Sequence, residues 1–476
     1  MCCQGGAMPL VLWTVTILGL VLFAGCAYAN IRIMLVPGKD CAEGQRTSCI
    51  PFVGGLAGAA ALLVCPVREA GFWCWVPLLA DPGTGLYLVM MLLALSRAPK
   101  DQIADEPRDV AEHAEVERLR TALTGCLLGG AVGDALGLSY EGLSRVRGTR
   151  LFPAVEHYHF LGRKGCCSDD TEHACLTAQA LLETTAYTPA FRADAFARHL
   201  AWKLRFWLLG LPAGIGMATL KAILRLWIGF PARSSGVRSA GNGPAMRSAV
   251  IGVRFGGEPE LMRALVLAST RLTHRDPRAE QGALAVALAA ACTAVGRCGN
   301  PCETFPPRLA EFLAAYPDGE LLALVERAAA SARRGDPTPV FAEEIGCGAG
   351  VSGYMPLSVA VALHAWFRYP ENLGSALTAV VRCGGDTDTV AAIAGGIIGA
   401  GVGKKGIPEQ WLRDLWEWPR STAWMESLAG CLAGTGTGTG RIRPAPRISP
   451  FALLLRNLAF LTVVLGHGVR RMLPPY

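Results

Sequence analysis

A short polar run lies directly in front of an apolar segment of small residues. The run Arg382–Thr389 holds two adjacent glycines, two carboxylates and two hydroxyls, and the segment Val390–Val402 is typical of a packed helix. Asp386 and Asp388 are two residues apart, so they cannot share a helix face, but they fit a first helical turn. Oxygens there can converge on a hard cation such as Mg²⁺, although simple capping would also explain them. A second acidic helix start at Ser168–Thr171 favours the metal.

The composition limits the class of protein. Of the 476 residues, 51% are hydrophobic and 17% are charged, which is too apolar for an ordinary soluble protein. The length predicts two to three units. The net charge of +7 is modest and the arginines are scattered, so we expect no nucleic-acid partner. The 17 cysteines include no Cys-x-x-Cys pair, which predicts reduced thiols, a cytosolic main domain and no zinc site.

The first 98 residues read as a membrane segment with two to three transmembrane helices. Leu10–Leu35 is long enough to span a bilayer, and no basic region precedes it, as a signal peptide would require. Pro51–Val67 is rich in Gly and Ala, which lets helices approach closely, although a buried soluble helix has the same composition. Phe72–Leu95 is interrupted by Asp81-Pro82-Gly83, so it either crosses or re-enters.

Basic residues predict the orientation of this segment. Arg32, Lys39 and Arg46 lie at the end of the first apolar stretch and in the loop after it, and Arg97 and Lys100 follow the third stretch. The positive-inside rule then places both regions, and the domain that follows, in the cytoplasm. Three crossings with an outer N-terminus satisfy both placements, and two crossings do not.

The remaining chain predicts an all-α domain between two linkers. Residues 99–110 form a polar, acidic linker, residues 111–432 the main domain, residues 433–448 a Gly/Thr/Pro-rich linker, and residues 449–476 an amphipathic tail. Runs of alternating β-branched residues are nearly absent from the main domain. The tail suits either an interfacial helix or a helix docked on the protein. Predicted helices of the main domain cover 174–186, 190–209, 215–228, 260–271, 279–295, 307–316, 320–334, 356–368, 372–382 and 389–402.

Four polar stretches interrupt the helical pattern. Besides the opening run, they are Gly129–Gly137 followed by Glu141, Ser168–Glu172, and Ser239–Arg247. Glu141 is seven residues after Asp134, so on one helix both would face the same way. The Gly-Asn-Gly turn within 239–247 precedes a helical segment, where free N–H groups could meet a phosphate, but a plain turn also fits. Thr273-His274 adds a lone histidine, a residue that is structural by default.

In this order and spacing, the stretches resemble the ADP-ribosylglycohydrolases, typified by the dinitrogenase reductase-activating glycohydrolase. The resemblance covers about residues 118 to 405, and the N-terminal segment lies outside it. The matching elements are Gly-Asp-Ala-Leu-Gly with Glu141, Ser-Asp-Asp-Thr, Gly-Asn-Gly-Pro-Ala-Met-Arg, Thr-His and Gly-Gly-Asp-Thr-Asp-Thr.

This resemblance implies an all-α fold with two Mg²⁺ ions, or Mn²⁺ in their place. It implies that the first ligand group is Ser168, Asp169 and Asp170, and the second is Asp386, Asp388 and Thr389. Serine stands where the family often has threonine, and it keeps the hydroxyl. Glu141 matches a glutamate near the metals and the ribose. The positions that match contacts to the ADP-ribose phosphates and ribose are Ser239, Gly241, Asn242 and His274. His173, beside the acidic pair, is not matched to a family position, and its role stays open.

The expected activity is hydrolysis of the bond between ADP-ribose and a modified protein side chain, with arginine favoured by the resemblance. Cleavage at C1 of ribose develops oxocarbenium character, and two hard cations could hold the ribose hydroxyls and lower the pKa of a bound water. Glu141 or Asp170 would transfer the proton. The expected partners are an ADP-ribosylated protein or conjugate and the lipid bilayer. The alternatives are a hydrolase of a free nucleotide or ADP-ribose conjugate, a non-catalytic ADP-ribose-binding module, and a sensor or channel built around Asp81.

Overall fold

The structure is a computed structural model. It describes residues 7–35, 53–67, 70–74, 76–77, 110–184, 189–296, 299–316, 319–435, 444–472 and 474. The chain divides into two compact units. The first comprises residues 1–101 with 206–211, and the second comprises residues 102–205 with 212–476.

The first unit contains two apolar helices that pack on each other. They are α1 (Ala7–Leu35) and α2 (Val53–Val64), followed by a short 3₁₀ turn, η1 (Ala70–Trp73). A Cβ added to Gly19 of α1 would lie 2.7 Å from the Cβ of Ala61, so small residues set the approach of the two helices. Most of the predicted third crossing, Phe72–Leu95, lies outside the described residues.

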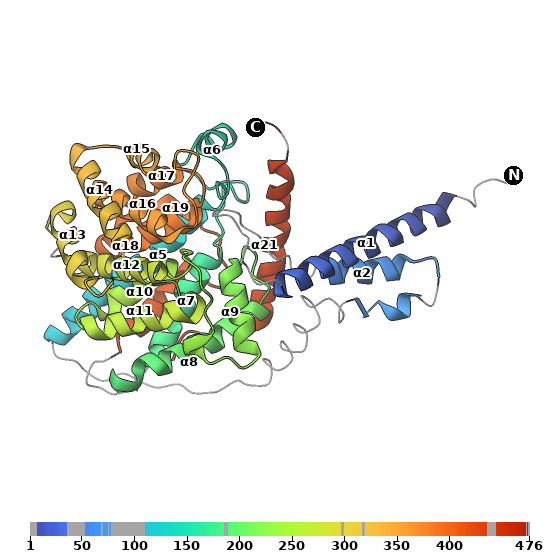
Figure 1. The fold of residues 1–476 in the computed structure, drawn as a ribbon, viewed down its shortest axis with the longest axis horizontal. Helices are drawn as coiled ribbons and strands as arrows, with labels where there is room; N and C mark the ends of the chain where they lie inside the picture. Colours follow the sequence, from blue (N-terminus) through green and yellow to red (C-terminus); the bar gives the residue numbers. More distant parts are fainter. Residues whose placement is uncertain are drawn as a thin grey trace. The chain divides into compact units, whose positions relative to one another are not determined.

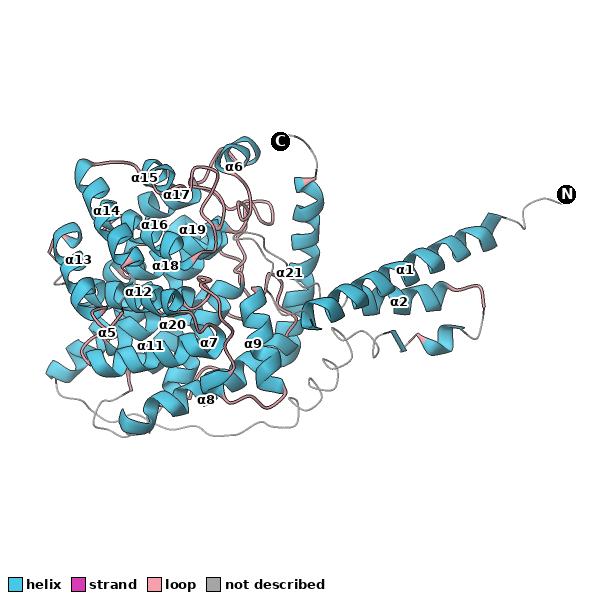
Figure 2. Cartoon of the chain, viewed as in Figure 1, coloured by secondary structure: helices cyan, strands magenta, loops and turns pink. Residues whose placement is uncertain are grey.

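The second unit is built from helices, as predicted (Figures 1 and 2). Its described residues form only isolated β-bridges and no sheet, because the sequence offers helical periodicity almost throughout. The helices are α5 (Val110–Gly137), α6 (Arg145–Leu151), α7 (Asp169–Glu183), α8 (Pro189–Leu209), α9 (Met217–Trp227), α10 (Ala249–Phe255), α11 (Pro259–Thr273), α12 (Pro277–Val295), α13 (Pro301–Phe312), α14 (Glu320–Arg334), α15 (Thr338–Glu344), α16 (Met355–Arg368), α17 (Leu373–Val381), α18 (Thr387–Val402), α19 (Glu409–Asp414), α20 (Thr422–Ala433) and α21 (Pro450–Arg471), with 3₁₀ turns η2 (Ala232–Ser234), η3 (Ala245–Arg247) and η4 (Lys404–Gly406).

Helix α18 forms the centre of this unit. All of its residues from Thr387 to Ala400 are buried, and α5, α12, α16 and α17 surround it (Figure 1). Helix α5 runs antiparallel to it: Gly137 at the end of α5 accepts a 2.8 Å hydrogen bond from the Thr387 hydroxyl, and Gly125 lies against Gly399. The antiparallel arrangement brings the last turn of α5 to the acidic start of α18.

Two helix ends matter for the site. Helix α7 begins at Asp169, as the acidic helix start at Ser168–Thr171 predicted, although the periodic segment was placed only from residue 174. Helix α5 ends at Gly137, so Glu141 lies in the turn beyond it and does not share a helix face with Asp134. The short helices α6 and α15 were not predicted, since seven residues give too little periodicity to recognise, whereas α10 is the helical segment expected after the Gly-Asn-Gly turn.

Among the described residues, α21 is the helix that is long and apolar enough to cross a membrane by length and composition. The described apolar stretch of α1, Leu12–Tyr28, is shorter than that criterion. In the second unit α21 is docked by one face, where Asn457 and Phe460 are buried, while Leu455 and Val469 on the other face are exposed. This is the docked arrangement of the tail that the sequence left open.

Candidate metal and substrate site

The first turn of α7 is fixed by a carboxylate from α5. The Ser168 N–H donates to both oxygens of Asp134 at 2.9 Å, and the Thr171 hydroxyl donates to the same carboxylate at 2.6 Å. The N–H groups of a first helical turn have no partner within the helix, and the helix dipole favours a negative charge there. Asp134 therefore holds the turn that presents Asp169 and Asp170.

Two left-handed glycines shape the turn before α18. Gly384 and Gly385 have φ of +73° and +79°, and a Cβ on Gly385 would lie 2.1 Å from the carbonyl oxygen of Val351. This is why the run needs its adjacent glycines. Gly385 also exchanges backbone hydrogen bonds with Gly142 and Leu143, at 2.7 and 2.8 Å. These bonds bring the turn that contains Glu141 beside the start of α18.

The two acidic helix starts meet. Carboxylate oxygens of Glu141, Asp386 and Asp388 all lie within 4.8 Å of one another. The Thr389 hydroxyl donates to Asp170 at 3.2 Å, which joins α18 to the first turn of α7. All of these groups offer oxygen atoms as metal ligands, and Mg²⁺ and Mn²⁺ prefer oxygen ligands.

The chemistry of the cluster fits a cation. Oδ1 of Asp170 is buried and has no hydrogen-bond partner within the described part of the chain, and its Oδ2 accepts from the Ser168 hydroxyl at 3.1 Å. Burial, followed by the charge of Asp134, raises the pKa of both Asp169 and Asp170 well above the usual range. Burial also raises the pKa of Asp134 to about 6. Carboxylates this close repel one another unless protons or metal ions compensate them.

A third element, the loop before η3, borders the acidic cluster. The Asn242 side chain donates to Asp386 at 2.8 Å and to the Ser358 hydroxyl at 3.1 Å. The Gly241 N–H donates to the Ser239 hydroxyl at 3.2 Å. The ring of His274 lies against this loop, since a Cβ on Gly241 would be 3.1 Å from its Nε2. All four predicted substrate-binding residues thus gather on one side of the carboxylates.

A buried arginine connects the two histidines of this region. Arg247 is fully buried and donates to His173 Nδ1 at 3.1 Å and to the Thr273 hydroxyl at 2.7 Å. The Thr273 hydroxyl also lies 2.9 Å from His274 Nδ1 and donates to the Thr270 carbonyl oxygen at 3.5 Å. Nε2 of His274 faces the Gly241 loop. Burial and the Arg247 charge lower the pKa of His274 to about 3, so the ring is neutral.

Several residues of the site were not singled out from the sequence. Asp134 and Arg247 lie inside motifs that the sequence analysis recognised. The signal that could have identified Asp134 is its place as the carboxylate of Gly-Asp-Ala-Leu-Gly. His173, whose role the sequence left open, accepts the Arg247 hydrogen bond. Glu417 and Arg456 lie outside every motif, and no sequence signal pointed to them.

The structure places every predicted site residue in this region. Asp169 is half-buried, and its Oδ1 lies 3.7 Å from where a Cβ on Gly214 would be. Glu141 is half-buried at the edge of the cluster. The residues joined by the contacts above are Ser168, Asp170, Asp386, Asp388, Thr389, Glu141 and Asn242. Their individual roles as ligands or catalysts stay predictions.

Comparisons with known proteins agree with this geometry. The family model for ADP-ribosylglycohydrolase matches residues 115–441. An uncharacterized protein of Archaeoglobus fulgidus is 31% identical over 64% of this chain and 93% of its own length. ADP-ribosylhydrolase ARH3 of Bos taurus is 28% identical over 63% of this chain and 89% of its own. ADP-ribosyl-(dinitrogen reductase) glycohydrolase of Rhodospirillum rubrum is 26% identical over 61% of this chain and 89% of its own.

A solved structure titled ADP-ribosylglycohydrolase-related protein complex aligns with a TM-score of 0.49 at 28% identity, covering 67% of this chain and 98% of that chain. The family model spans well over half of the sequence and includes both acidic helix starts and the loop that carries Asn242. The chain belongs to the ADP-ribosylglycohydrolase family and is a hydrolase of that family.

Proposed function

We propose that this enzyme is a membrane-anchored, Mg²⁺-dependent hydrolase that releases ADP-ribose from a modified protein side chain, with arginine as the favoured acceptor. One observation carries the proposal: the acidic starts of α7 and α18 meet beside the Asn242 loop in a member of the ADP-ribosylglycohydrolase family. The alternative is a hydrolase of a free ADP-ribose conjugate or nucleotide.

Two groups of side chains would hold the metal ions. They are Ser168, Asp169 and Asp170 on α7, and Asp386, Asp388 and Thr389 on α18. Bound there, two hard cations would fix the ribose hydroxyls and lower the pKa of water at the site. The crowding of the carboxylates supports this assignment. Burial and their mutual repulsion raise the pKa of Asp170, and bound cations would relieve that repulsion.

Two carboxylates are placed to move protons. Cleavage at C1 of ribose develops oxocarbenium character, so the attacking water needs a base and the leaving group needs help. Glu141 lies at the open edge of the cluster, and Asp170 lies inside it with a pKa raised by burial. Either could take the proton from the water. The His274 ring and the Asn242 amide would orient the ADP-ribose on the other side.

Two observations support an arginine side chain of a protein as the acceptor: the negative charge of the site and the printed name of one relative. A guanidinium linked to ribose is cationic, and the carboxylates of Glu141 and Asp388 offer it a complementary surface. The Rhodospirillum rubrum relative carries a protein substrate in its printed name, which supports a protein-linked conjugate.

Attachment to the membrane is proposed from the first unit. Helices α1 and α2 are strongly apolar and pack through small residues, as membrane helices do. The basic residues after the first and third predicted crossings would keep the catalytic unit in the cytoplasm. Flotation of the full chain with liposomes that resists alkaline carbonate would support this attachment, and extraction by carbonate would refute it.

The decisive experiment measures ADP-ribose release by the full chain in detergent. Three substrates are compared: an arginine-linked ADP-ribosyl peptide, a serine-linked one, and a free nucleotide conjugate. We expect release from the arginine peptide with Mg²⁺ and none with EDTA. Preference for the serine peptide would overturn the acceptor, cleavage of the free conjugate alone would support the alternative, and tight binding without release would indicate a binding module.

A further inference from the structure

Helix α21 lies beyond residue 441, where the match to the family model ends. Its inner face docks on the segment that leads into α7. Phe460 is buried and packs against Phe160 with ring centroids 5.0 Å apart, and the His467 ring stacks on the same phenylalanine at 5.1 Å. His467 Nε2 also lies 2.6 Å from the Phe160 carbonyl oxygen. The helix is therefore held by specific contacts as well as by apolar burial.

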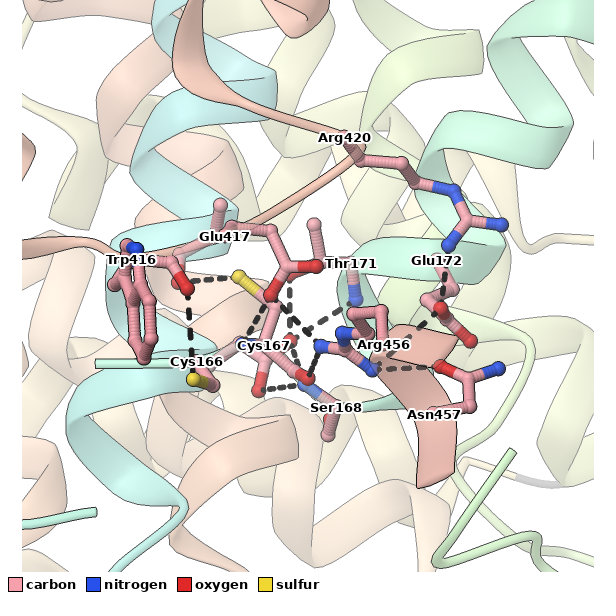
Figure 3. Close-up of polar contacts among 12 residues, drawn as sticks. Cys166, Cys167, Ser168, Thr171, Glu172, Trp416, Glu417, Arg420, Arg456 and Asn457 are labelled. Atoms are coloured by element: carbon pink, nitrogen blue, oxygen red, sulfur yellow. Dashed lines mark hydrogen bonds and ion pairs between the residues drawn. The ribbon is translucent and has the colours of Figure 1, made fainter. Parts of the chain in front are cut away.

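An arginine of α21 joins a network of buried polar groups (Figure 3). Arg456 donates to Glu417 Oε2 at 2.7 Å, lies 3.8 Å from Glu172 Oε1, and also donates to the Cys167 carbonyl oxygen. Its side chain is 9% exposed, and those of Glu172 and Glu417 are 3% and 2% exposed. Arg456 thus bridges two buried carboxylates that come from different parts of the chain.

Both carboxylates lie next to the first proposed ligand group, Ser168, Asp169 and Asp170. Glu172 lies in the first turn of α7, together with Asp169 and Asp170. Glu417 accepts the Cys167 N–H at 2.9 Å, one residue before the ligand Ser168. The Arg456 contacts therefore hold the chain immediately before and after the proposed ligands.

The network is balanced in charge. Glu172 also pairs with Arg420, so two buried carboxylates face two buried guanidinium groups (Figure 3). Without Arg456 a carboxylate would stay buried without its cation, next to a cluster that is already negative, which is strongly unfavourable. We expect the first turn of α7 to shift so that water can reach Glu417.

The C-terminal end of α21 contacts the turn that carries Glu141. Arg471 donates to the carbonyl oxygens of Leu138 and Ser139 at 3.4 and 3.1 Å, in the turn that carries Glu141. Arg147 in turn donates to the Arg471 carbonyl oxygen. One helix beyond the family match therefore contacts two of the three segments that contribute carboxylates to the site.

We propose that α21 supports the catalytic centre through Arg456. Arg456 is a positioning residue that keeps the first turn of α7 in the geometry that binds metal. The inference rests on the proposed metal-dependent function. It assigns a role to a residue outside the proposed ligand set that lies beyond residue 441, where the family match ends.

The test compares four variants of the full chain. Arg456→Met removes the charge, Arg456→Lys keeps it without the planar fork, and the double variant Arg456→Met/Glu417→Gln removes both charges while leaving an acceptor for the Cys167 N–H. Arg470→Met is the matched control, because Arg470 is an exposed arginine of the same helix. Each protein is assayed for Mn²⁺ affinity by calorimetry, for metal-free melting temperature, and for kcat and KM.

We expect Arg456→Met to weaken Mn²⁺ binding by ~10-fold or more, as for other groups that support metal ligands, and to lower kcat more than it raises KM. The double variant should recover most of the Mn²⁺ affinity, because its network is neutral again. Arg470→Met should equal the unmodified protein.

Unchanged Mn²⁺ affinity in Arg456→Met, with only a lower melting temperature, would mean that the residue merely stabilises the fold and would overturn the inference. If that variant does not fold, Arg456→Lys decides in the same way: weakened Mn²⁺ binding supports the inference and wild-type affinity overturns it. An unmodified protein that binds Mn²⁺ but releases no ADP-ribose would refute the proposed reaction, while the Mn²⁺ comparison would still decide the role of Arg456.

Discussion

Gly129 on α5 and Gly395 on α18 are in direct backbone contact. A Cβ on Gly129 would lie 2.3 Å from the Gly395 carbonyl oxygen, and a Cβ on Gly395 would lie 2.1 Å from the Gly129 carbonyl oxygen. No side chain fits between the two helices at this crossing. The same crossing sets the position of Asp134 at the end of α5 relative to Asp388 at the start of α18.

Substituting Gly395 should therefore disturb both the fold and the site. We expect Gly395→Ala to lower the free energy of unfolding by about 3 kcal/mol or more, because the added methyl group meets backbone atoms and forces the helices apart. Hydrolysis should fall with it. Gly216→Ala is the control, since Gly216 has φ of −61° and nothing within 4 Å of its added Cβ. Equal melting temperatures for the two variants would contradict the close crossing.

Removing a carboxylate should abolish metal binding without unfolding the protein. We expect Asp388→Ala and Asp388→Asn to lower the rate of hydrolysis by ~10³-fold, because metal ions contribute several kcal/mol to transition-state stabilisation. The metal-free melting temperature should not fall for Asp388→Asn, since repulsion within the cluster is relieved. Calorimetry with Mn²⁺ and an assay of ADP-ribose release measure both effects. The exposed Glu371→Gln serves as control, and near-wild-type hydrolysis by Asp388→Ala would refute the ligand assignment.

The hydrogen-bond chain from Arg247 to His274 should control substrate binding. Thr273→Val keeps the shape of the side chain but removes the hydroxyl that joins the two residues. Without it, the His274 ring loses the contact that holds its orientation, so we expect KM to rise by ~10-fold with a smaller change in kcat. Thr270→Val is a matched control, because the Thr270 hydroxyl donates only to the Val266 carbonyl oxygen of its own helix. A wild-type KM in Thr273→Val would exclude this role.

Stability should fall on mild acidification because of a histidine far from the metal ligands. His364 is buried, stacks on Phe341 and contacts the hydroxyls of Ser331 and Thr338, and burial lowers its pKa from 6.5 to about 4. Between these two values the unfolded chain binds a proton that the native protein does not bind. The histidine therefore removes about 3 kcal/mol as the pH falls from 6.5 to 4, and no more below that range.

Denaturant unfolding of the metal-free protein at several pH values tests this prediction. We expect His364→Gln to be less stable than wild type at pH 7, because it loses the stacking, but to lose less stability toward pH 4. Parallel stability curves for the two proteins would show that His364 does not titrate in this way.

Local sequence determined much of the architecture. Helical periodicity was enough to predict the all-α fold and most helices longer than ten residues, because a buried helix face repeats every three to four residues. Adjacent glycines before Asp386 predicted the tight turn, since only glycine adopts positive φ at little cost. The two acidic helix starts were also visible, because Ser, Asp and Thr at such positions serve the free N–H groups of a first turn.

Only the tertiary structure decided which groups face one another. Asp134 and Glu141, seven residues apart, diverge because α5 ends between them: one holds α7 and the other joins Asp388. Arg456 contacts Cys167, which is 289 residues away in the sequence, and no local pattern predicts such a contact. Periodicity reports which face of a helix is buried, whereas the partner of a buried charge depends on the path of the whole chain.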